Sequence, residues 1–342
     1  MARVGIGVIG LGRMGRVYAT HTARQIEGAG LLAVADPDPA ALADFSALGV
    51  QAFADYRDLL ADPRVQAVIV ASPTSTHAEV VREAAQAGKA IFCEKPLALT
   101  LEATDEAIGA VERAGVPLQV GFMRRFDRGY VEARRKIDAG VIGQPVMIRS
   151  IGRDPHRTSL EFANPAVSGG LIVDMAIHDF DSLRWLMDDE IERVYAETAS
   201  LVYPELASVG DADTAMINVR FARGGLGNVE VSRTAIYGYD IRCEVVGALG
   251  TLEIGYLRET PLLLLNRDGV THDVVPHFPQ RFGPAYTRQL EHFVECLLHD
   301  RPPVVGAADA RAALIACLAA TRSRHEGRVV CLREIEDVMK PN

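Results

Sequence analysis

The sequence feature that most constrains the fold is a glycine motif near the N-terminus, Gly10-Leu11-Gly12-Arg13-Met14-Gly15. A Val- and Ile-rich run at residues 3–9 precedes it, and a predicted helix follows to about residue 25. A strand before and a helix after are the context in which this motif binds a dinucleotide. The glycines permit a tight turn, close approach of a pyrophosphate and close helix packing, and the helix N-terminus offers N–H groups to the phosphates. We therefore predict that Gly10, Gly12, Arg13, Met14 and Gly15 bind a cofactor.

An acidic residue, Asp36, follows the next predicted strand, residues 31–35, about 20 residues after the motif. A carboxylate there accepts hydrogen bonds from both ribose hydroxyls of the adenosine half and repels a 2′-phosphate, which favours NAD over NADP. The turn sequence Asp36-Pro37-Asp38-Pro39 leaves a second interpretation open, in which Asp36 is a helix cap.

Strands and helices alternate through residue 122. The predicted strands are 3–9, 31–35, 50–53, 66–71, 90–93 and 117–122, and the predicted helices between them include 40–48, 56–61, 78–87 and 101–114. This alternation predicts a doubly wound parallel sheet, an α/β fold of the Rossmann type. Ligands bind such sheets at the carboxyl ends of the strands.

Polar residues stand at those ends. Ser72, Thr74 and His77 follow one strand and can hydrogen-bond ribose or nicotinamide, while Glu94 and Lys95 follow the next. Capping of the following helix by Ser75 or Thr76 is the alternative for the hydroxyls. Lys95 precedes Pro96 at the expected nicotinamide end of the cleft, where a lysine is a candidate for function rather than a solvated surface charge.

The pattern changes at about Met123, so we expect residues 1–122 to form an NAD(P)-binding domain and residues 123–342 an α+β domain for substrate binding and oligomerisation. A helix at 130–139 and strands at 146–151, 194–200, 214–221, 227–234, 242–246, 251–254, 262–266 and 271–275 are predicted, with closing helices at 285–299 and 308–327. Short turns between strands indicate a large, mostly antiparallel sheet. Its open face needs a cover, and a second copy of the chain is the simple candidate.

Residues 169–185, GGLIVDMAIHDFDSLRW, read as one amphipathic helix. Asp174, His178, Asp181 and Trp185 share one face of it, bordered by apolar residues. Charged groups in an apolar stripe are costly to bury unless they are paired or used. A structural ion pair, a metal site formed by Asp174 and His178, and a catalytic pair are the three interpretations, although no third metal ligand stands at a fixed spacing.

Composition and charge argue against several classes of protein and of binding partner. The net charge of −9 and the lack of a basic cluster disfavour nucleic acid and anionic membranes as partners. No apolar run approaches the roughly 18 residues of a membrane span. The N-terminal apolar run contains four glycines and leads directly into the glycine motif, so we interpret it as a strand and not as a signal sequence. The five cysteines are scattered, without zinc spacing, as in a reduced cytoplasmic protein.

The motifs together resemble one family. GVIGLGRMG in the first loop, SPTSTHAEV at 72–80, CEKPLA at 93–98, GFMRRFD at 121–127 and GGLIVDMAIHDFDSLRWL at 169–186 occur in this order. This set resembles the Gfo/Idh/MocA oxidoreductases over nearly the whole chain, and most of all their inositol 2-dehydrogenases. The resemblance implies a Rossmann domain, a second domain whose open sheet forms a dimer or tetramer, and NAD(P)-linked oxidation of a sugar or cyclitol hydroxyl.

Carried over to this chain, the resemblance implies that Lys95, Asp174 and His178 form the catalytic set. His178 is then the general base, Asp174 orients it, and Lys95 polarises the substrate oxygen. Met123, Arg124, Asp154 and Tyr239 are expected to contact the polyol substrate. A salt bridge to Asp127 or to the acidic surface is the alternative for Arg124 and Arg125, and sheet packing is the alternative for Tyr239.

Three functions follow from the same residues. The first is an NAD-dependent dehydrogenase of an inositol or a related cyclitol, with another pyranose or a sugar acid as substrate alternatives, since several arginines and His156 suit a carboxylate. The second is a glycosidase that uses NAD transiently. The third is an NAD-binding regulator without activity. The presence of Lys95, Asp174 and His178 together argues against it, because a regulator does not need a catalytic set.

Overall fold

The structure, a computed structural model, describes residues 3–337 of the 342-residue chain. They form two compact units. Unit 1 contains the residues up to Phe126 together with Pro284–Arg311, and unit 2 contains Asp127–Gly283 together with the residues from Ala312 onward. The sequence pattern predicts that the chain passes from the first domain to the second only once, between residues 122 and 123. The structure differs because residues 284–311 pack against strands far away in the sequence, which local periodicity does not report.

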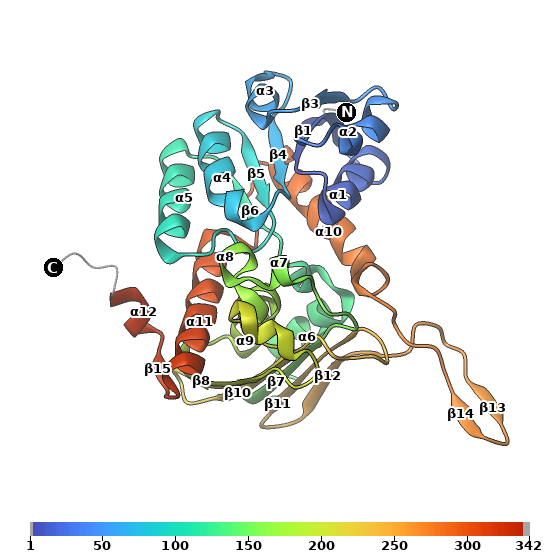
Figure 1. The fold of residues 1–342 in the computed structure, drawn as a ribbon, viewed down its shortest axis with the longest axis vertical. Coiled ribbons are helices and arrows are strands. Elements are labelled where there is room, and N and C mark those ends of the chain that lie inside the picture. The colour runs from blue at the N-terminus through green and yellow to red at the C-terminus, as the bar shows by residue number, and fades with distance from the viewer. Residues whose placement is uncertain (1–2, 338–342) are drawn as a thin grey trace. The chain divides into compact units, whose positions relative to one another are not determined.

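Unit 1 contains a six-stranded sheet in the order β3-β2-β1-β4-β5-β6, in which every neighbouring pair is parallel (Figure 1). Its strands are β1 Val4–Ile9, β2 Ala29–Ala35, β3 Gln51–Phe53, β4 Ala67–Val70, β5 Ala90–Cys93 and β6 Leu118–Val120. Strands β1, β4 and β5 are buried along their whole length, as expected where helices cover both faces. The predicted doubly wound parallel sheet is confirmed.

Local sequence explains where the helices of unit 1 begin and end. The side chains of Asp38, Asp55 and Thr100 accept backbone N–H groups at the starts of α2, α3 and α5, and Gly115 ends α5 with φ of +63°. The elements are α1 Arg13–Arg24, α2 Pro39–Ser46, α3 Tyr56–Ala61, α4 His77–Gln86 and α5 Leu101–Ala114, with 3-10 turns at η1 Thr74–Thr76 and η2 Met123–Phe126.

The returning segment completes the core of unit 1. The Phe293 ring lies 6.0 Å from that of Phe92, and Gln119 Nε2 donates to the Gln289 carbonyl oxygen at 2.8 Å. The segment belongs to helices α10 Phe278–Leu298 and α11 Ala307–Glu326. Helix α10 begins before the predicted residue 285 and keeps Pro284 in its interior. Because proline normally stands in the first turn of a helix, the sequence indicates a later start.

Unit 2 contains a seven-stranded sheet in the order β12-β11-β7-β10-β9-β8-β15. Its strands are β7 Pro145–Arg153, β8 Ile191–Ala199, β9 Thr214–Phe221, β10 Leu226–Ser232, β11 Asp240–Gly247, β12 Thr251–Gly255 and β15 Val330–Cys331. Only β10 and β7 pair in parallel among these described strands, so the predicted mostly antiparallel sheet is confirmed. Ser232 and Asp240 both pair with Arg153, so the ends of β7 and β10 and the start of β11 share one edge.

Helices lie on one face of this sheet, and the other face is open (Figure 1). Met147, Met216 and Leu226 point from the open face and are 45%, 53% and 51% exposed. Such a face is expected to pair with another surface. The remaining elements of unit 2 are α6 Arg128–Asp138, α7 Leu160–Ala163, α8 Pro165–Ser168, the π-helix η3 Ile172–Ala176, α9 Ile177–Met187, the 3-10 helix η4 Pro204–Val209 and α12 Arg333–Asp337.

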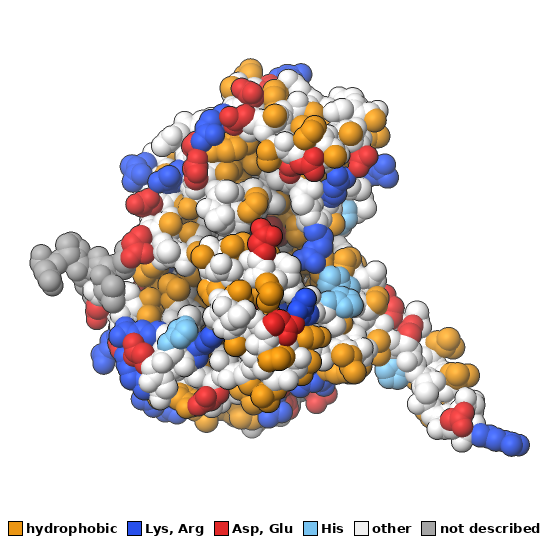
Figure 2. Space-filling view, in the orientation of Figure 1, with side chains coloured by type: hydrophobic (Ala, Val, Ile, Leu, Met, Phe, Trp, Pro, Cys, Tyr) orange, Lys and Arg blue, Asp and Glu red, His pale blue; other side chains and the backbone are white. Residues whose placement is uncertain are grey.

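A hairpin of unit 2 forms a separate two-stranded sheet and projects away from the large one (Figure 1). It consists of β13 Leu264–Asn266 and β14 Gly269–Thr271, joined by the expected turn at residues 267 and 268. The second strand begins earlier than the predicted residue 271, because a two-residue loop pairs Asn266 with Gly269. Apolar side chains line the hairpin, including Leu262, Leu265 and Val270 (Figure 2).

Candidate active site

The glycine loop of unit 1 has the geometry that a dinucleotide site requires. Gly10 has φ of +86°, and a Cβ at Gly15 would lie 1.8 Å from the Gly10 carbonyl oxygen. A Cβ at Gly12, in contrast, would meet no described atom within 4 Å. Gly12 begins α1 without a capping side-chain hydrogen bond, and the first turn carries no acidic residue. The positive end of this helix therefore remains available to an anion.

Asp36 is tied to this loop. Its Oδ2 accepts the Leu11 N–H at 2.6 Å, and its Oδ1 accepts the Asp38 N–H at 2.9 Å. The side chain that caps α2 belongs to Asp38, which accepts the Ala40 N–H at 2.9 Å, so the helix-cap interpretation of Asp36 does not hold. A carboxylate offers about four acceptor sites, so Asp36 retains capacity for hydroxyl donors.

Ser72 and His77 form the loop after β4. Ser72 Oγ lies 2.7 Å from Thr76 Oγ1, and Thr76, which precedes α4, makes no side-chain cap. The His77 ring is 2% exposed and bridges two carbonyl oxygens, Pro96 O at Nδ1 and Ser72 O at Nε2, both at 2.8 Å. Burial lowers the pKa of His77. His77 thus joins the Ser72 loop to the loop after β5, and we do not include its ring among the proposed cofactor contacts.

Glu94 and Lys95 follow β5. Glu94 accepts the Tyr18 hydroxyl through Oε1 and the Lys95 backbone N–H at 3.1 Å through Oε2. Burial raises the pKa of Glu94. Gln289 Nε2 donates to the Tyr18 oxygen at 2.8 Å, so the network reaches the returning segment. Lys95 is partly exposed, and its peptide bond to Pro96 is cis. The Glu94 network thereby holds the backbone from which the Lys95 side chain extends.

The predicted substrate residues of unit 1, Met123 and Arg124, lie in η2 and are each 3% exposed. The neighbouring Arg125 pairs with Asp309 at 2.6 Å, whereas Asp127 pairs with Arg281 in unit 2 at 2.7 Å. Each of these two pairs joins residues more than a hundred positions apart, which sequence spacing does not reveal.

Residues 169–185 of unit 2 do not form the single α-helix that we expected. A π-helix, η3, covers Ile172–Ala176 and is followed directly by α9 from Ile177. π-Helical turns inside helices are rare and occur frequently at functional sites. Within residues 171–183 every side chain is buried except those of Asp174 and His178, which are partly exposed. Asp181, on the same stretch, is fully buried.

Asp154 and Tyr239 lie at the edge of the large sheet where β7 and β10 end. The Asp154 N–H donates to the Ser232 carbonyl oxygen at 2.8 Å, and the Tyr239 N–H donates to Val275 O at 2.7 Å. The Tyr239 ring is 7% exposed and packs edge-on against His277 and Phe282, with centroids 5.9 Å and 6.2 Å apart. Tyr239 thus packs against the start of α10 rather than against the sheet, at the same edge as Asp154.

Two charged residues of this region were missed in the sequence. Arg233 follows β10, is 2% exposed and donates from Nη2 to Asp174 Oδ2 at 3.0 Å, and Asp211 is fully buried beside it. A signal for Arg233 was present, because Val229, Val231 and Arg233 alternate on the buried face of a predicted strand. No comparable pattern marks Asp211, which stands in the loop before β9.

Comparison with known proteins places the chain. Residues 4–122 match the family model described as the oxidoreductase family with an NAD-binding Rossmann fold, and residues 130–253 match the GFO/IDH/MocA C-terminal domain. The chain belongs to the Gfo/Idh/MocA oxidoreductase family. It is 40% identical to scyllo-inositol 2-dehydrogenase (NAD(+)) of Bacillus subtilis, covering 96% of each chain. It is also 40% identical to myo-inositol 2-dehydrogenase of Thermotoga maritima, covering 96% of this chain and 99% of the relative.

A solved relative agrees in fold. The crystal structure of scyllo-inositol dehydrogenase from Lactobacillus casei with bound NAD(H) and scyllo-inositol matches with a TM-score of 0.92 at 32% identity. The match covers 97% of this chain and 99% of the relative. The Gfo/Idh/MocA assignment therefore extends through both units.

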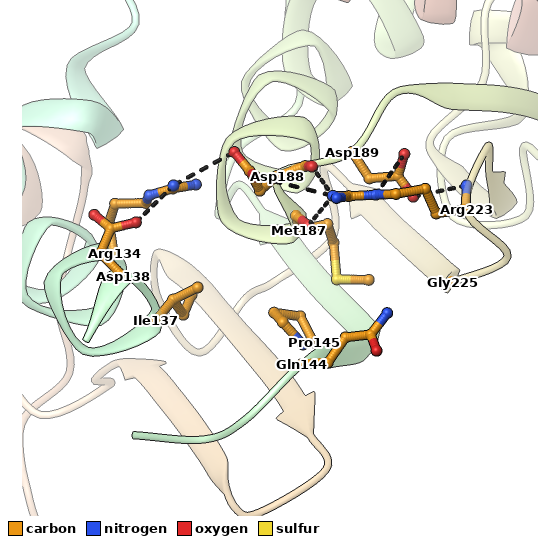
Figure 3. Close-up of a pocket in the computed structure, with 10 residues that line it drawn as sticks. All are labelled: Arg134, Ile137, Asp138, Gln144, Pro145, Met187, Asp188, Asp189, Arg223 and Gly225. Atoms are coloured by element: carbon orange, nitrogen blue, oxygen red, sulfur yellow. Dashed lines mark hydrogen bonds and ion pairs between the residues drawn. The ribbon is translucent and has the colours of Figure 1, made fainter. Parts of the chain in front are cut away.

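A pocket of about 320 Å³ in this Gfo/Idh/MocA chain lies at the C-terminal end of α9, and none of the predicted site residues lines it (Figure 3). Arg223 donates to the carbonyl oxygens of Met187 and Asp188, and Arg134 donates to the Trp185 carbonyl oxygen and pairs with Asp138 at 2.6 Å. These arginines satisfy carbonyl groups that a helix end leaves without partners. The pocket is lined by Arg134, Ile137, Asp138, Gln144, Pro145, Met187, Asp188, Asp189, Arg223 and Gly225, and we assign it a structural role.

Residues 3–337 contain no group of three His, Cys, Asp or Glu side chains arranged to hold a metal ion. Among the same residues, none of the helices combines the length and the apolar character needed to span a membrane.

Proposed function

We propose that this chain is an NAD-dependent dehydrogenase that oxidises a ring hydroxyl of an inositol or a related cyclitol to the ketone. Two curated relatives with 40% identity are named for the oxidation of scyllo- and myo-inositol. The observation that carries the proposal is the partial exposure of Asp174 and His178 in an otherwise buried stretch, in a chain whose other unit is an NAD-binding Rossmann fold.

The residues of unit 1 fit NAD. The uncapped start of α1 at Gly12, with Arg13 and Met14 in the first turn, would hold the pyrophosphate. The Asp36 carboxylate would accept the ribose hydroxyls, and Asp38 adds a second negative charge that disfavours a 2′-phosphate. Ser72, Thr74, Glu94 and Lys95 stand after β4 and β5, at the carboxyl ends that bind the nicotinamide half in such sheets.

The proposed chemistry separates a proton from a hydride. When bound, NAD accepts the hydride at its nicotinamide ring. A ring nitrogen of His178 takes the proton from the substrate hydroxyl, since imidazole titrates near neutral pH. Asp174 orients the ring and stabilises the imidazolium that forms. The Lys95 ammonium stabilises the negative charge that develops on the substrate oxygen.

Polar groups at the edge of the large sheet support a polyol substrate. Asp154 is partly exposed at the end of β7, one residue beyond Arg153, and we propose that it accepts ring hydroxyls. Arg124 and Met123 are proposed to border the substrate from unit 1, and Tyr239 from the start of β11. A carboxylated sugar would need a cation free of carboxylate partners, whereas Arg153 is already paired with Glu230 at 2.5 Å.

The test is a panel of inositols, pyranoses and sugar acids, each with NAD and with NADP, followed by NADH absorbance. Lys95→Ala and His178→Ala are expected to lower kcat by about 100-fold or more while the Kd for NAD changes little. Lys136→Ala, at a partly exposed position, and His325→Ala, at an exposed one, serve as matched controls. Full turnover in Lys95→Ala or His178→Ala would refute the assignment. Release of a sugar from a glycoside without net NADH would favour the NAD-using glycosidase instead.

We further propose a cytoplasmic homo-oligomer, a dimer or a tetramer, held together through the open face of the large sheet. The exposed side chains of Met147, Met216 and Leu226 on that face support such an interface. The free thiols of all five cysteines support a reducing compartment.

A further inference from the structure

Arg233 is the largest side chain among those that are almost fully buried in the structure, with 2% exposure. A guanidinium is always charged, and burial of a charge is costly unless carboxylates and hydrogen bonds compensate it. The backbone does not require arginine at this position, since a valine would continue the buried alternation of β10. A buried charge at a position where the backbone accepts an apolar side chain points to a role of the charge itself.

The charge lies between two carboxylates. Nη2 donates to Asp174 Oδ2 at 3.0 Å, and Nη1 lies 3.6 Å from Asp211 Oδ2. Asp211 is fully buried, while Asp174 retains 24% of its side-chain exposure. The group of three therefore carries one net negative charge, whose exposed end is Asp174. A cation that forms next to Asp174, such as an imidazolium, would neutralise the group.

Asp211 also fixes the start of the helical stretch that carries Asp174. Its Oδ1 accepts the Leu171 N–H at 2.8 Å, and a Cβ at Gly170, where φ is +73°, would lie 2.8 Å from the same oxygen. This approach explains the glycine at 170. One buried carboxylate thereby holds both the backbone before η3 and the guanidinium that reaches the side chain of η3.

The sheet holds Arg233 from the other side. Its backbone N–H donates to the Asp213 carbonyl oxygen at 2.9 Å, directly after Ser232, the last residue of β10. The Asp174 carboxylate is thus connected to a rigid sheet edge through Arg233 and to its own backbone through Asp211. A side chain on a π-helical turn gains a fixed orientation from such a connection.

We propose that Arg233, held by Asp211, is a positioning residue for Asp174: it orients the carboxylate that in turn orients the general base His178. This inference rests on the proposed function and deepens it. Arg233 contacts neither substrate nor cofactor in this role. Its contribution passes entirely through Asp174, which makes it separable by experiment.

The test is a double-mutant cycle between Arg233→Met and Asp174→Asn, with kcat, KM, the Kd for NAD and the melting temperature measured for each protein. Arg233→Met alone is expected to lower kcat by about 10- to 100-fold, with little change in the Kd for NAD. In the Asp174→Asn background the same change is expected to cost less than about threefold, because the carboxylate that it positions is gone. Arg233→Lys, which restores the charge but not the planar fork, is expected to recover part of kcat.

Arg328→Met is the matched control, because Arg328 also pairs with two carboxylates, Glu326 and Glu334, but is 43% exposed. An equal loss of kcat in both backgrounds would overturn the inference, since it would show that Arg233 acts through general stability. If Arg233→Met does not fold, Asp211→Asn and Arg233→Lys replace it in the cycle. A loss of kcat that shrinks in the Asp174→Asn background is again expected, and an equal loss in both backgrounds would again overturn the inference. Full turnover in Asp174→Asn would instead refute the catalytic role proposed for Asp174, and absence of NADH from the unmodified protein with every inositol would refute the proposed function. A normal loss in Asp174→Asn with unchanged kcat in the Arg233 variants would refute only the positioning role.

Discussion

Asp36 Oδ2 accepts the backbone N–H of Leu11 at 2.6 Å, so the carboxylate at the end of β2 is fixed to the glycine loop at the end of β1. The two positions that a dinucleotide needs, one for its ribose and one for its pyrophosphate, are therefore held in a defined relationship before any ligand binds. Preorganisation of this kind reduces the ordering that binding must otherwise impose.

The cofactor preference should depend on this carboxylate. Asp36→Ser is expected to raise the KM for NAD about tenfold, because hydrogen bonds to a charged group are lost, and to narrow the gap between NAD and NADP. Parallel kinetics with both cofactors measure it. Asp44→Ser, at an exposed partner of Arg16, is the control. Faster turnover of the unmodified protein with NADP than with NAD would contradict the role of Asp36.

Gly12 and Gly15 should respond differently to a single added methyl group. Gly15→Ala places Cβ 1.8 Å from the Gly10 carbonyl oxygen, so it should lower the melting temperature and abolish NAD binding. Gly12→Ala meets no described atom within 4 Å, so the melting temperature should remain unchanged while NAD binding weakens. Calorimetry of both variants distinguishes these outcomes. Unchanged NAD affinity in Gly12→Ala would remove this glycine from the binding site.

Acid should destabilise unit 1. Burial lowers the pKa of His292, and likewise of His21 and His77. The unfolded chain then binds these protons more readily, so stability is complete above about pH 6.5 and falls as the pH is lowered toward the folded pKa. Melting temperatures between about pH 7.5 and pH 5.5 should fall by a few degrees.

A variant at His292 tests the cause. Its Nε2 accepts the Val304 N–H at 3.2 Å, which a protonated ring cannot do. His292→Gln keeps an acceptor without titrating, so its melting temperature should fall less with acid than that of the unmodified protein. His299→Gln, at an exposed position, should follow the unmodified protein. The same pH dependence in His292→Gln would show that acid acts elsewhere.

The open sheet face should control oligomeric state. Met147 and Leu226 pair across β7 and β10 and are 45% and 51% exposed. Met147→Glu combined with Leu226→Glu should reduce the molar mass measured by light scattering, because burial of two paired charges of the same sign is unfavourable. Leu48→Glu in unit 1, at a position 59% exposed, should leave the mass unchanged. An oligomer that survives the double change would require another interface.

Residues that carry local signals were predicted well. Several elements have the bounds that were predicted from the spacing of apolar residues, from capping side chains and from glycines at helix ends. They are the helices at 56–61 and 101–114 and the strands at 90–93 and 214–221. Asp36 was also placed correctly at the end of its strand, although its hydrogen bond to Leu11 depends on the neighbouring strand.

The remaining features depend on residues distant in sequence. The π-helical turn at Ile172–Ala176 cannot be distinguished from an α-helix by apolar spacing, because the same side chains fit either form and only the backbone hydrogen bonds differ, joining residues five apart instead of four. The link between Arg233 and Asp174 joins residues 59 positions apart, and the Asp211 side chain enters from a loop. The strand pattern marks Arg233 as inward-facing, but only the pairing of buried charges in the structure identifies its partners.

The division of unit 1 between two stretches of chain has a consequence for its biosynthesis. Phe293 and Gln289, which contact Phe92 and Gln119 in its core, leave the ribosome only after all of Asp127–Gly283 has been made. Residues 3–126 must therefore wait, with part of their apolar surface exposed, while more than half of the other unit emerges. A fragment that stops at Phe126 would reproduce this waiting state permanently and would invite aggregation.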